Sequence, residues 1–324
     1  MKYYNIHELI KLESTINFPR INYFKTPVPV KPDIRVITGK FNDLPESRDS
    51  LRLTNKYKLS RWKIQVEGFE SPPIIIHFDG DRLFSHKLLF SAIVEPLIKY
   101  ILSIKGGTML HASSLSLNDC GMAFCGQSGT GKTTALLNTL KLPTSKYYSD
   151  DQTIVKDGVM YCYPTPIGVR TNTLINTPLT VNPVDLAGIL GQNLLNVLTL
   201  YYGNLTWDLP LTRLRVGDKH IVTGTTTKLN RIYMMEVGEK DGVKKIEKDD
   251  VYPYLKELNM SVNQKQVILN KYFSRYREKT GIDLWKKTRK VLQKITDMCD
   301  YYLVTLQKPY KLQSLINEVQ EVYP

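Results

Sequence analysis

Polar and apolar residues alternate in short stretches of the first 82 residues, which is the pattern of half-buried strands. Residues 61–66 alternate strictly, and residues 74–78 form an apolar run after a Pro-Pro turn. β-Branched residues, which favour strands, concentrate at residues 28–30 and 33–37. We therefore expect residues 1–82 to form a smaller, β-rich N-terminal region.

A helix is expected next, over residues 83–104, because apolar side chains recur there at helical spacing. The residues on this apolar face are Leu89, Ile93, Leu97 and Tyr100. Pro96 should kink the helix, since proline lacks the N–H that a helix interior needs. Gly106 and Gly107 should end it.

The middle of the chain predicts a β-hairpin that leads directly into a glycine-rich loop. Residues 109–117 alternate in their second half, residues 118–121 read as a turn, and residues 122–125 form a short apolar run. The loop begins at Gly126. Residues 133–141 then carry the apolar face of a short helix.

The pattern of the remaining residues, 145–324, predicts a mixture of strands and helices. The expected fold class is therefore α/β. The expected elements are short strands and loops over 145–232 with one apolar helix at 184–200, a strand at 231–237, a charged helical segment at about 239–297, a strand at 301–306 and a closing helix at 312–322. We expect residues 83–324 to form one domain that contains this charged segment.

The composition is that of a basic globular protein. The 324 residues include 44 Lys and Arg against 31 Asp and Glu, a formal charge of +13. Such a balance favours acidic partners: nucleotides, nucleic acid, anionic lipid or an acidic peptide. The four cysteines form no CxxC pair, and the N-terminus has no apolar signal-peptide core. We therefore expect reduced thiols, a cytoplasmic protein and no membrane partner.

The glycine-rich loop matches the phosphate-binding pattern G-x-x-x-x-G-K-[ST] without a mismatch. The candidate nucleotide-binding residues are Gly126, Gln127, Ser128, Gly129, Thr130, Gly131, Lys132, Thr133 and Thr134. Glycines let the backbone approach a polyphosphate, and the N–H groups that open a helix attract anions. Lys132 can bridge the β- and γ-phosphates, and the Thr133 hydroxyl can bind Mg²⁺. A glycine-rich turn without a ligand is the alternative interpretation.

Asp150 and Asp151 are the candidate acidic partners of this loop. They follow an expected strand and lie 18 residues after Lys132, a length that fits one helix, a turn and a strand returning to the site. One carboxylate can hold Mg²⁺ and the other can accept a proton from an incoming hydroxyl, in either order. A solvated turn is the alternative. His111, which precedes the loop by 15 residues, could face the phosphates from the paired strand.

Three stretches now stand in order: LHASS at 110–114, GQSGTGKTT at 126–134 and SDD at 149–151. Together they resemble the HPr kinase/phosphorylase-like family, whose nucleotide-binding core is shared with phosphoenolpyruvate carboxykinase. The resemblance implies a P-loop core with a mixed sheet and a hairpin that enters the phosphate loop. It also implies ATP and Mg²⁺ as ligands and catalytic roles for Lys132, Asp150, Asp151 and His111.

The chain departs from the HPr kinases at one signature. Their Glu-Ile-Arg sequence after the Asp pair is missing, and residues 164–170 occupy its place. Arg170 could supply the arginine, since a guanidinium suits a transferring phosphoryl group, or it could be an ordinary surface residue. The β-rich N-terminal region resembles instead the related kinases that phosphorylate a serine of a ribosomally made peptide.

A second basic feature lies in residues 271–294. The basic residues are Lys271, Arg275, Arg277, Lys279, Lys286, Lys287, Arg289, Lys290 and Lys294. Glu278 and Asp283 are the acidic residues of the segment, and Tyr272, Phe273, Tyr276 and Trp285 are interleaved. The segment is either a docking surface for an acidic peptide or a nucleic acid, or a solvated pair of helices whose aromatic residues belong to the core.

These observations favour an ATP-dependent kinase that transfers a phosphoryl group to a hydroxyl, and we expect a serine of a protein or peptide as acceptor. A nucleotide-binding regulator without catalysis is the alternative that the missing Glu-Ile-Arg signature favours. A nucleic-acid-binding ATPase ranks last, because no helicase-like motif accompanies the loop.

Overall fold

The computed structural model describes residues 1–41, 50–57, 60–80, 89–198, 207–260, 267–307 and 312–322. The chain divides into two compact units, each assembled from two stretches of sequence. Unit 1 comprises Met1–Thr108 and Met260–Val291, and unit 2 comprises Met109–Asn259 and Leu292–Pro324. The domain boundary expected between residues 82 and 83 lies outside the described residues.

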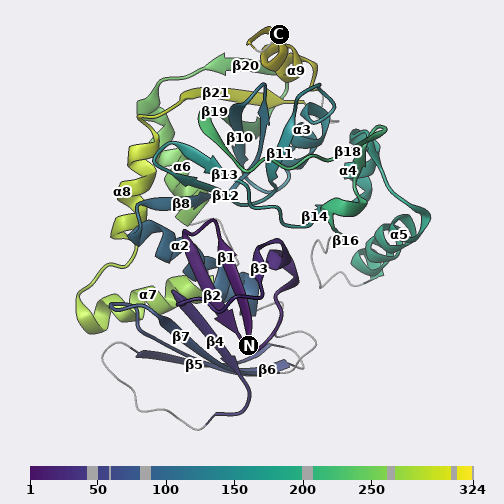
Figure 1. Ribbon diagram of the computed structural model, residues 1–324. Coiled ribbons are helices and arrows are strands. Elements are labelled where there is room, and N and C mark those ends of the chain that lie inside the picture. Colours follow the sequence, from purple (N-terminus) through teal and green to yellow (C-terminus); the bar gives the residue numbers. More distant parts are fainter. Residues whose placement is uncertain are drawn as a thin grey trace. The chain divides into compact units, whose positions relative to one another are not determined.

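Unit 1 is built on a mixed sheet of order β3-β1-β2-β4-β7-β6-β5 (Figure 1). Its strands are β1 (Lys2–Ile6), β2 (Ile10–Ser14), β3 (Lys25–Thr26), β4 (Ile34–Thr38), β5 (Ser50–Tyr57), β6 (Ser60–Glu67) and β7 (Ile74–Gly80). The pairs β2–β4 and β4–β7 are parallel, whereas β1–β2, β5–β6 and β6–β7 are antiparallel. The expected strands at 33–37, 61–66 and 74–78 are confirmed.

The strand expected at residues 28–30 is wrong, because these residues have no regular secondary structure. Pro27, Pro29 and Pro32 surround them. Proline has no backbone N–H to donate to a sheet ladder, so the β-branched residues between these prolines cannot build one. The preceding strand β3 ends at Thr26.

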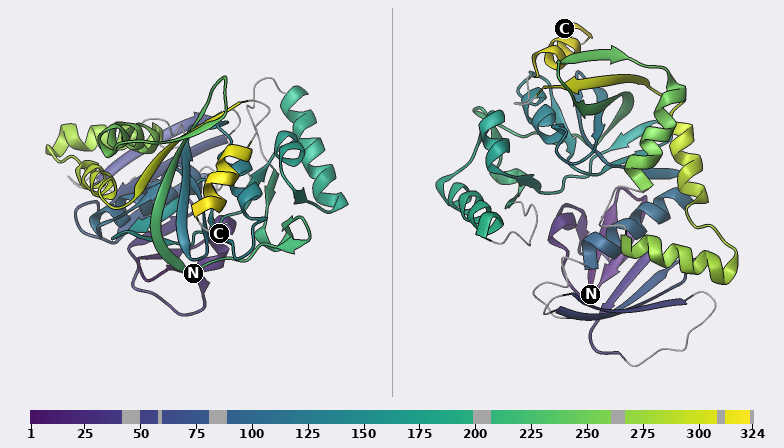
Figure 2. Two further views of the ribbon diagram at one scale, coloured as in Figure 1. Left: turned by 90° about the horizontal axis from the view of Figure 1, so that it is seen from above. Right: turned by 180° about the vertical axis from the view of Figure 1, so that it is seen from behind.

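Helices cover one face of this sheet (Figure 2). They are η1 (Pro19–Phe24), η2 (Phe90–Val94), α2 (Glu95–Ile104) and α7 (Val267–Thr280). The expected helix at 83–104 is seen from residue 89 onward, and Pro96 lies in the first turn of α2, directly after the π-helical turn η2. Residues 83–88 lie outside the described residues. Gly106 follows α2 with a positive φ of 82°, as the helix end requires.

Unit 2 contains a central sheet in which β10, β19 and β21 run parallel. Its strands are β8 (Gly107–Leu110), β9 (Ala112–Leu117), β10 (Cys120–Gly126), β11 (Lys146–Ser149), β12 (Thr153–Lys156), β13 (Val159–Tyr161), β19 (Thr226–Val237), β20 (Gly242–Lys245) and β21 (Asp300–Leu306). The order is β11-β9-β10-β19, with β21 and then β20 beyond β19. The first residues of β19 pair instead with β13, which leads through β12 to β8.

Smaller elements complete unit 2, and Figure 2 shows α4 and α5 at one side of its central sheet. They are β14 (Ile167–Val169), α4 (Thr171–Asn176), β15 (Leu179–Thr180), α5 (Pro183–Leu198), β16 (Trp207–Leu209), η3 (Leu211–Arg213), β17 (Arg215–Val216), β18 (Lys219–His220), η4 (Lys248–Asp250), α6 (Val251–Met260) and α9 (Gln313–Val322). The helix α8 (Lys286–Ile295) crosses from one unit into the other. Among the described residues of the region at 239–297, the helices are η4, α6, α7 and α8, and β20 is a strand that was not expected.

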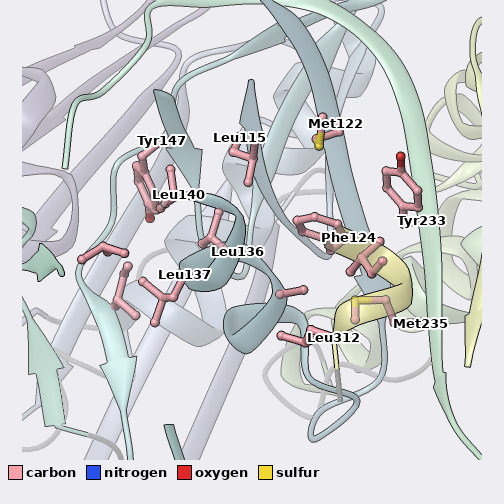
Figure 3. Close-up of a cluster of buried hydrophobic side chains, with 14 of the residues drawn as sticks. Leu115, Met122, Phe124, Leu136, Leu137, Leu140, Tyr147, Tyr233, Met235 and Leu312 are labelled. Carbon is pink, nitrogen blue, oxygen red and sulfur yellow. The ribbon is translucent and has the colours of Figure 1, made fainter. Parts of the chain in front are cut away.

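The core of unit 2 forms where α3 (Lys132–Thr139) packs on the central sheet. Figure 3 shows Leu136 and Leu137 of this helix among Leu115 of β9, Phe124 of β10 and Leu140. Every one of these side chains is less than a tenth exposed. Burial of each large side chain contributes about 1.5–3 kcal/mol, so this packing fixes the start of α3 relative to the end of β10.

Candidate active site

The glycine-rich loop connects the end of β10 to the start of α3, as the sequence predicts. Gly129 and Gly131 have positive φ values of 85° and 94°, which side chains rarely adopt. A Cβ on Gly126 would lie 2.6 Å from Oγ1 of Thr130 and 2.7 Å from the backbone oxygen of Met235. These three glycines are therefore required by the backbone path, and the first N–H groups of α3 open towards the loop.

Lys132 is buried, with a side chain that lies across the loop. Its Nζ donates hydrogen bonds to the backbone oxygens of Gly126 at 2.7 Å and Gln127 at 2.9 Å. Burial lowers the pKa of the Lys132 ammonium, and the nearby carboxylates of Asp151 and Asp150 oppose that shift. The ammonium thus lies inside the loop, against its backbone oxygens.

The topology brings three chain segments to one edge of the sheet. The strand β9 pairs antiparallel with both β10 and β11, so β10 and β11 point the same way. Their final residues therefore share an edge with the first residues of β9. The loop follows β10, Asp150 and Asp151 follow β11, and His111 precedes β9. This arrangement brings the loop, the Asp pair and His111 to the same edge of the sheet.

Asp150 is 6% exposed and faces the first turn of α3. Its carboxylate accepts hydrogen bonds from Oγ1 of Thr133, at 3.1 Å to Oδ1 and 3.3 Å to Oδ2, and from Oγ of Ser113 at 2.5 Å. Burial raises the pKa of the Asp150 carboxyl, and the Ser113 hydrogen bond works against that rise. Because a hydroxyl and a carboxylate are ligands that Mg²⁺ prefers, the Thr133–Asp150 pair can hold this ion.

Asp151 differs from Asp150 in exposure and in partner. Its side chain is 33% exposed and lies beside His111, with 3.3 Å between Oδ1 and Nδ1. Nδ1 also lies 3.1 Å from the backbone oxygen of Asp151. Both neighbours accept hydrogen bonds, so we assign the ring proton to Nδ1. Asp151 has a positive φ of 75°, a strained conformation of the kind that clusters at functional sites.

Sequence reasoning missed three residues that hold this arrangement. Ser113, which lies in the LHASS stretch on β9, donates a hydrogen bond to the Asp150 carboxylate. Thr165 donates to the backbone oxygen of Asp150. Oδ1 of Asn259, on α6, accepts the backbone N–H of His111 at 2.7 Å. Asn259 lies 148 residues from His111, and no local pattern points to that contact.

The other predicted nucleotide-binding residues occupy the loop and the first turn of α3. Gln127, Ser128 and Gly129 are exposed at the tip of the loop. Oγ1 of Thr130 donates to the backbone oxygen of Gln127 at 2.9 Å and closes the turn. Thr134 is buried on α3. The exposed tip leaves the loop accessible to a ligand.

Arg170 follows β14 and immediately precedes α4. Its backbone oxygen accepts the N–H of Thr173 at 2.9 Å. The far end of α4 contacts α3, where Nδ2 of Asn138 donates to the backbone oxygen of Asn176. A catalytic role of Arg170 stays a prediction.

Three aromatic residues of the basic segment at 271–294, namely Phe273, Tyr276 and Trp285, belong to the core of unit 1. The rings of Phe273 and Trp285 are 4.7 Å apart, and Phe273 also contacts Phe69 at 5.9 Å. Tyr276 is fully buried and donates a hydrogen bond to Glu70. The side chains of Lys271, Tyr272 and Lys279 lie outside the described residues. Phe273, Tyr276 and Trp285 are therefore part of the core and not of an exposed surface.

No protein-family model matches the chain, and no curated protein matches its sequence. Among the described helices, none is long and apolar enough to cross a membrane.

Proposed function

We propose that this chain is an ATP- and Mg²⁺-dependent kinase that transfers the γ-phosphoryl group to a hydroxyl, and that the acceptor is a serine of a protein or peptide. The resemblance to HPr-kinase-like proteins supports the P-loop core of this proposal. The observation that carries it is the contact between Thr133 and Asp150, because it joins the loop to the Asp pair as metal-dependent phosphoryl transfer requires.

The residues around the loop fit a nucleotide triphosphate with its metal. Gly126 has no room for a Cβ, and Gly129 and Gly131 have positive φ values, so the backbone of the loop follows a path that favours glycine and suits a close approach to phosphate oxygens. The side-chain oxygens of Thr133 and Asp150 form a hard donor pair suited to Mg²⁺. When bound, Mg²⁺ would neutralise charge on the β- and γ-phosphates.

In the proposed transfer, Lys132 and the start of α3 bind the phosphates. Lys132 and the N–H groups that open α3 stabilise the negative charge that develops on the phosphate oxygens. The Lys132 ammonium now donates to two carbonyl oxygens of the loop, which a phosphate oxygen can replace. No large rearrangement of the buried lysine is needed for this exchange.

Asp151 acts as the general base, because it is the more exposed carboxylate of the pair and lies beside His111, whereas Asp150 accepts the Thr133 hydroxyl. Its carboxylate takes the proton of the acceptor hydroxyl while the hydroxyl oxygen bonds to the γ-phosphorus and the bond to the leaving ADP oxygen breaks. His111 orients this carboxylate through Nδ1, and Asn259 holds the backbone of His111.

The test is incubation with γ-labelled ATP, Mg²⁺ and candidate acceptors, namely the small peptides and proteins encoded beside its gene. We expect label on a serine with the wild-type protein and none with Lys132→Met. Label that never leaves ATP, despite saturable nucleotide binding, would support the non-catalytic regulator instead. Hydrolysis stimulated by nucleic acid would support the nucleic-acid-binding ATPase.

A further inference from the structure

The helix α8 carries a row of lysines on one of its sides. Its exposed lysines are Lys286, Lys287, Lys290 and Lys294, which we call the lysine face. The opposite side buries Thr288, Leu292 and Ile295. At about 100° per residue, the four lysines fall within an arc of roughly 100°, and the row is about 12 Å long.

The lysine face is not neutralised by its surroundings. None of its four ammonium groups forms an ion pair within the residues that the structure describes, whereas the neighbouring Arg289 is bound to Asp283. Lys286 and Lys287 occupy the first turn of α8, where the helix dipole disfavours cations. Lys286 and Lys287 therefore weaken the start of the helix, so their presence there does not serve the stability of the helix, whereas Lys294 lies in the last turn, where a cation is favoured.

We propose that the lysine face docks an acidic segment of the phosphoacceptor peptide or protein. The identification of the partner as the phosphoacceptor rests on the proposed kinase function. Charge complementarity indicates that the partner segment is acidic, because a row of four unpaired ammonium groups attracts a run of carboxylates.

A peptide suits this surface better than a nucleic acid does. Single-stranded nucleic acids bind by stacking their bases on exposed aromatic rings, but Phe273, Tyr276 and Trp285 are buried in unit 1.

The binding experiment measures the fluorescence anisotropy of a labelled peptide of twelve glutamates at several salt concentrations. The test variant replaces all four lysines of the face by glutamate. The matched control replaces Lys2, Lys25, Lys31 and Lys40, which are exposed in unit 1, and changes the net charge by the same amount. Unchanged Mg-ATP binding and circular dichroism verify that both variants are folded.

We expect the test variant to lose at least about tenfold in affinity for the glutamate peptide, and the control variant to change by less than about twofold. Equal losses in the two variants would overturn the docking surface, because they would reflect net charge alone. Tighter binding of a dT12 oligonucleotide than of the peptide, lost in the same test variant, would overturn the choice of partner.

A kinetic experiment separates this proposal from the kinase assignment. With an acidic serine peptide as acceptor, the test variant should raise the KM for peptide and leave kcat and the KM for ATP unchanged. A decrease in kcat alone would contradict docking. Absence of transfer by the wild-type protein would refute the kinase function, while the anisotropy comparison would still decide whether the lysine face binds carboxylates.

Discussion

Replacing Thr133 by valine removes one hydroxyl from the candidate site and keeps the shape of the side chain. In the wild-type protein this hydroxyl lies 3.1 Å and 3.3 Å from the two carboxylate oxygens of Asp150. Asp150 is buried, so few water molecules can replace the lost donor. Valine leaves Ser113 as the remaining side-chain donor that we describe for this carboxylate.

The expected loss of stability follows from the charge of the acceptor. A hydrogen bond to a charged group contributes about 1.5–3 kcal/mol, so Thr133→Val should lower the free energy of unfolding by an amount in this range. The same substitution removes a proposed Mg²⁺ ligand. The gain in nucleotide affinity on adding Mg²⁺ should therefore fall by about tenfold or more.

The assay combines urea denaturation of the nucleotide-free protein with calorimetric titration of ATP, in Mg²⁺ and in EDTA. Thr133→Ser is the matched control, because it retains the hydroxyl and should keep both the stability and the Mg²⁺ effect. The reasoning is refuted if Thr133→Val shows the wild-type gain in affinity on adding Mg²⁺, since the hydroxyl would then take no part in metal binding.

Three further substitutions test separate parts of the account. Gly126→Ala places a Cβ against Thr130 and Met235, so it should destabilise the protein by about 1–3 kcal/mol in urea denaturation, whereas Gly191→Ala, in open space on α5, should not. Burial raises the pKa of Asp150, so the charged carboxylate lowers the stability of the folded state once the pH exceeds the ordinary carboxyl pKa. Asp150→Asn should therefore raise the melting temperature of the nucleotide-free protein at pH 7 but not at pH 3. A lower melting temperature of the variant at pH 7 would contradict this. Burial lowers the pKa of Lys99 to about 7, so between pH 7 and pH 10 the unfolded chain binds one proton more than the folded protein. The free energy of unfolding of the wild-type protein minus that of Lys99→Met should therefore rise by up to roughly 1.4 kcal/mol per pH unit in this range. A difference that does not change with pH would refute the shift.

The hairpin, the loop and α3 could be predicted from the sequence because their signals are local. The alternation of β9, the turn at Asn118 and Asp119 and the glycines of the loop each act within a few residues. Asn118 and Asp119 adopt positive φ values, as the turn between β9 and β10 requires. Once these elements are placed, the order of the strands brings Asp150 to the loop.

Other features depend on contacts between distant parts of the chain. Residues 260–291 join unit 1 because Phe273 and Tyr276 pack against Phe69 and Glu70, some 200 residues earlier. The edge strand β20 lies in a charged stretch without apolar alternation, and it forms because β21 offers a partner. The contact of Asn259 with His111 also joins residues that are distant in the sequence, so only the folded structure reveals it.

The proposed roles of the two aspartates could be told apart only in the structure. From the sequence, Asp150 and Asp151 are adjacent and chemically identical, so either could bind the metal or take the proton. Burial and the Thr133 contact distinguish Asp150, and exposure and the His111 contact distinguish Asp151. This difference in environment supports the division of labour that we propose.

The most direct test of the central claim is the transfer of labelled γ-phosphoryl by the wild-type protein and by Asp151→Asn at saturating Mg-ATP. We expect the wild-type protein to label a serine, and the variant to transfer about 10²- to 10⁴-fold more slowly while it binds ATP with unchanged affinity. A variant that transfers as fast as the wild-type protein would contradict the assignment of Asp151 as the base.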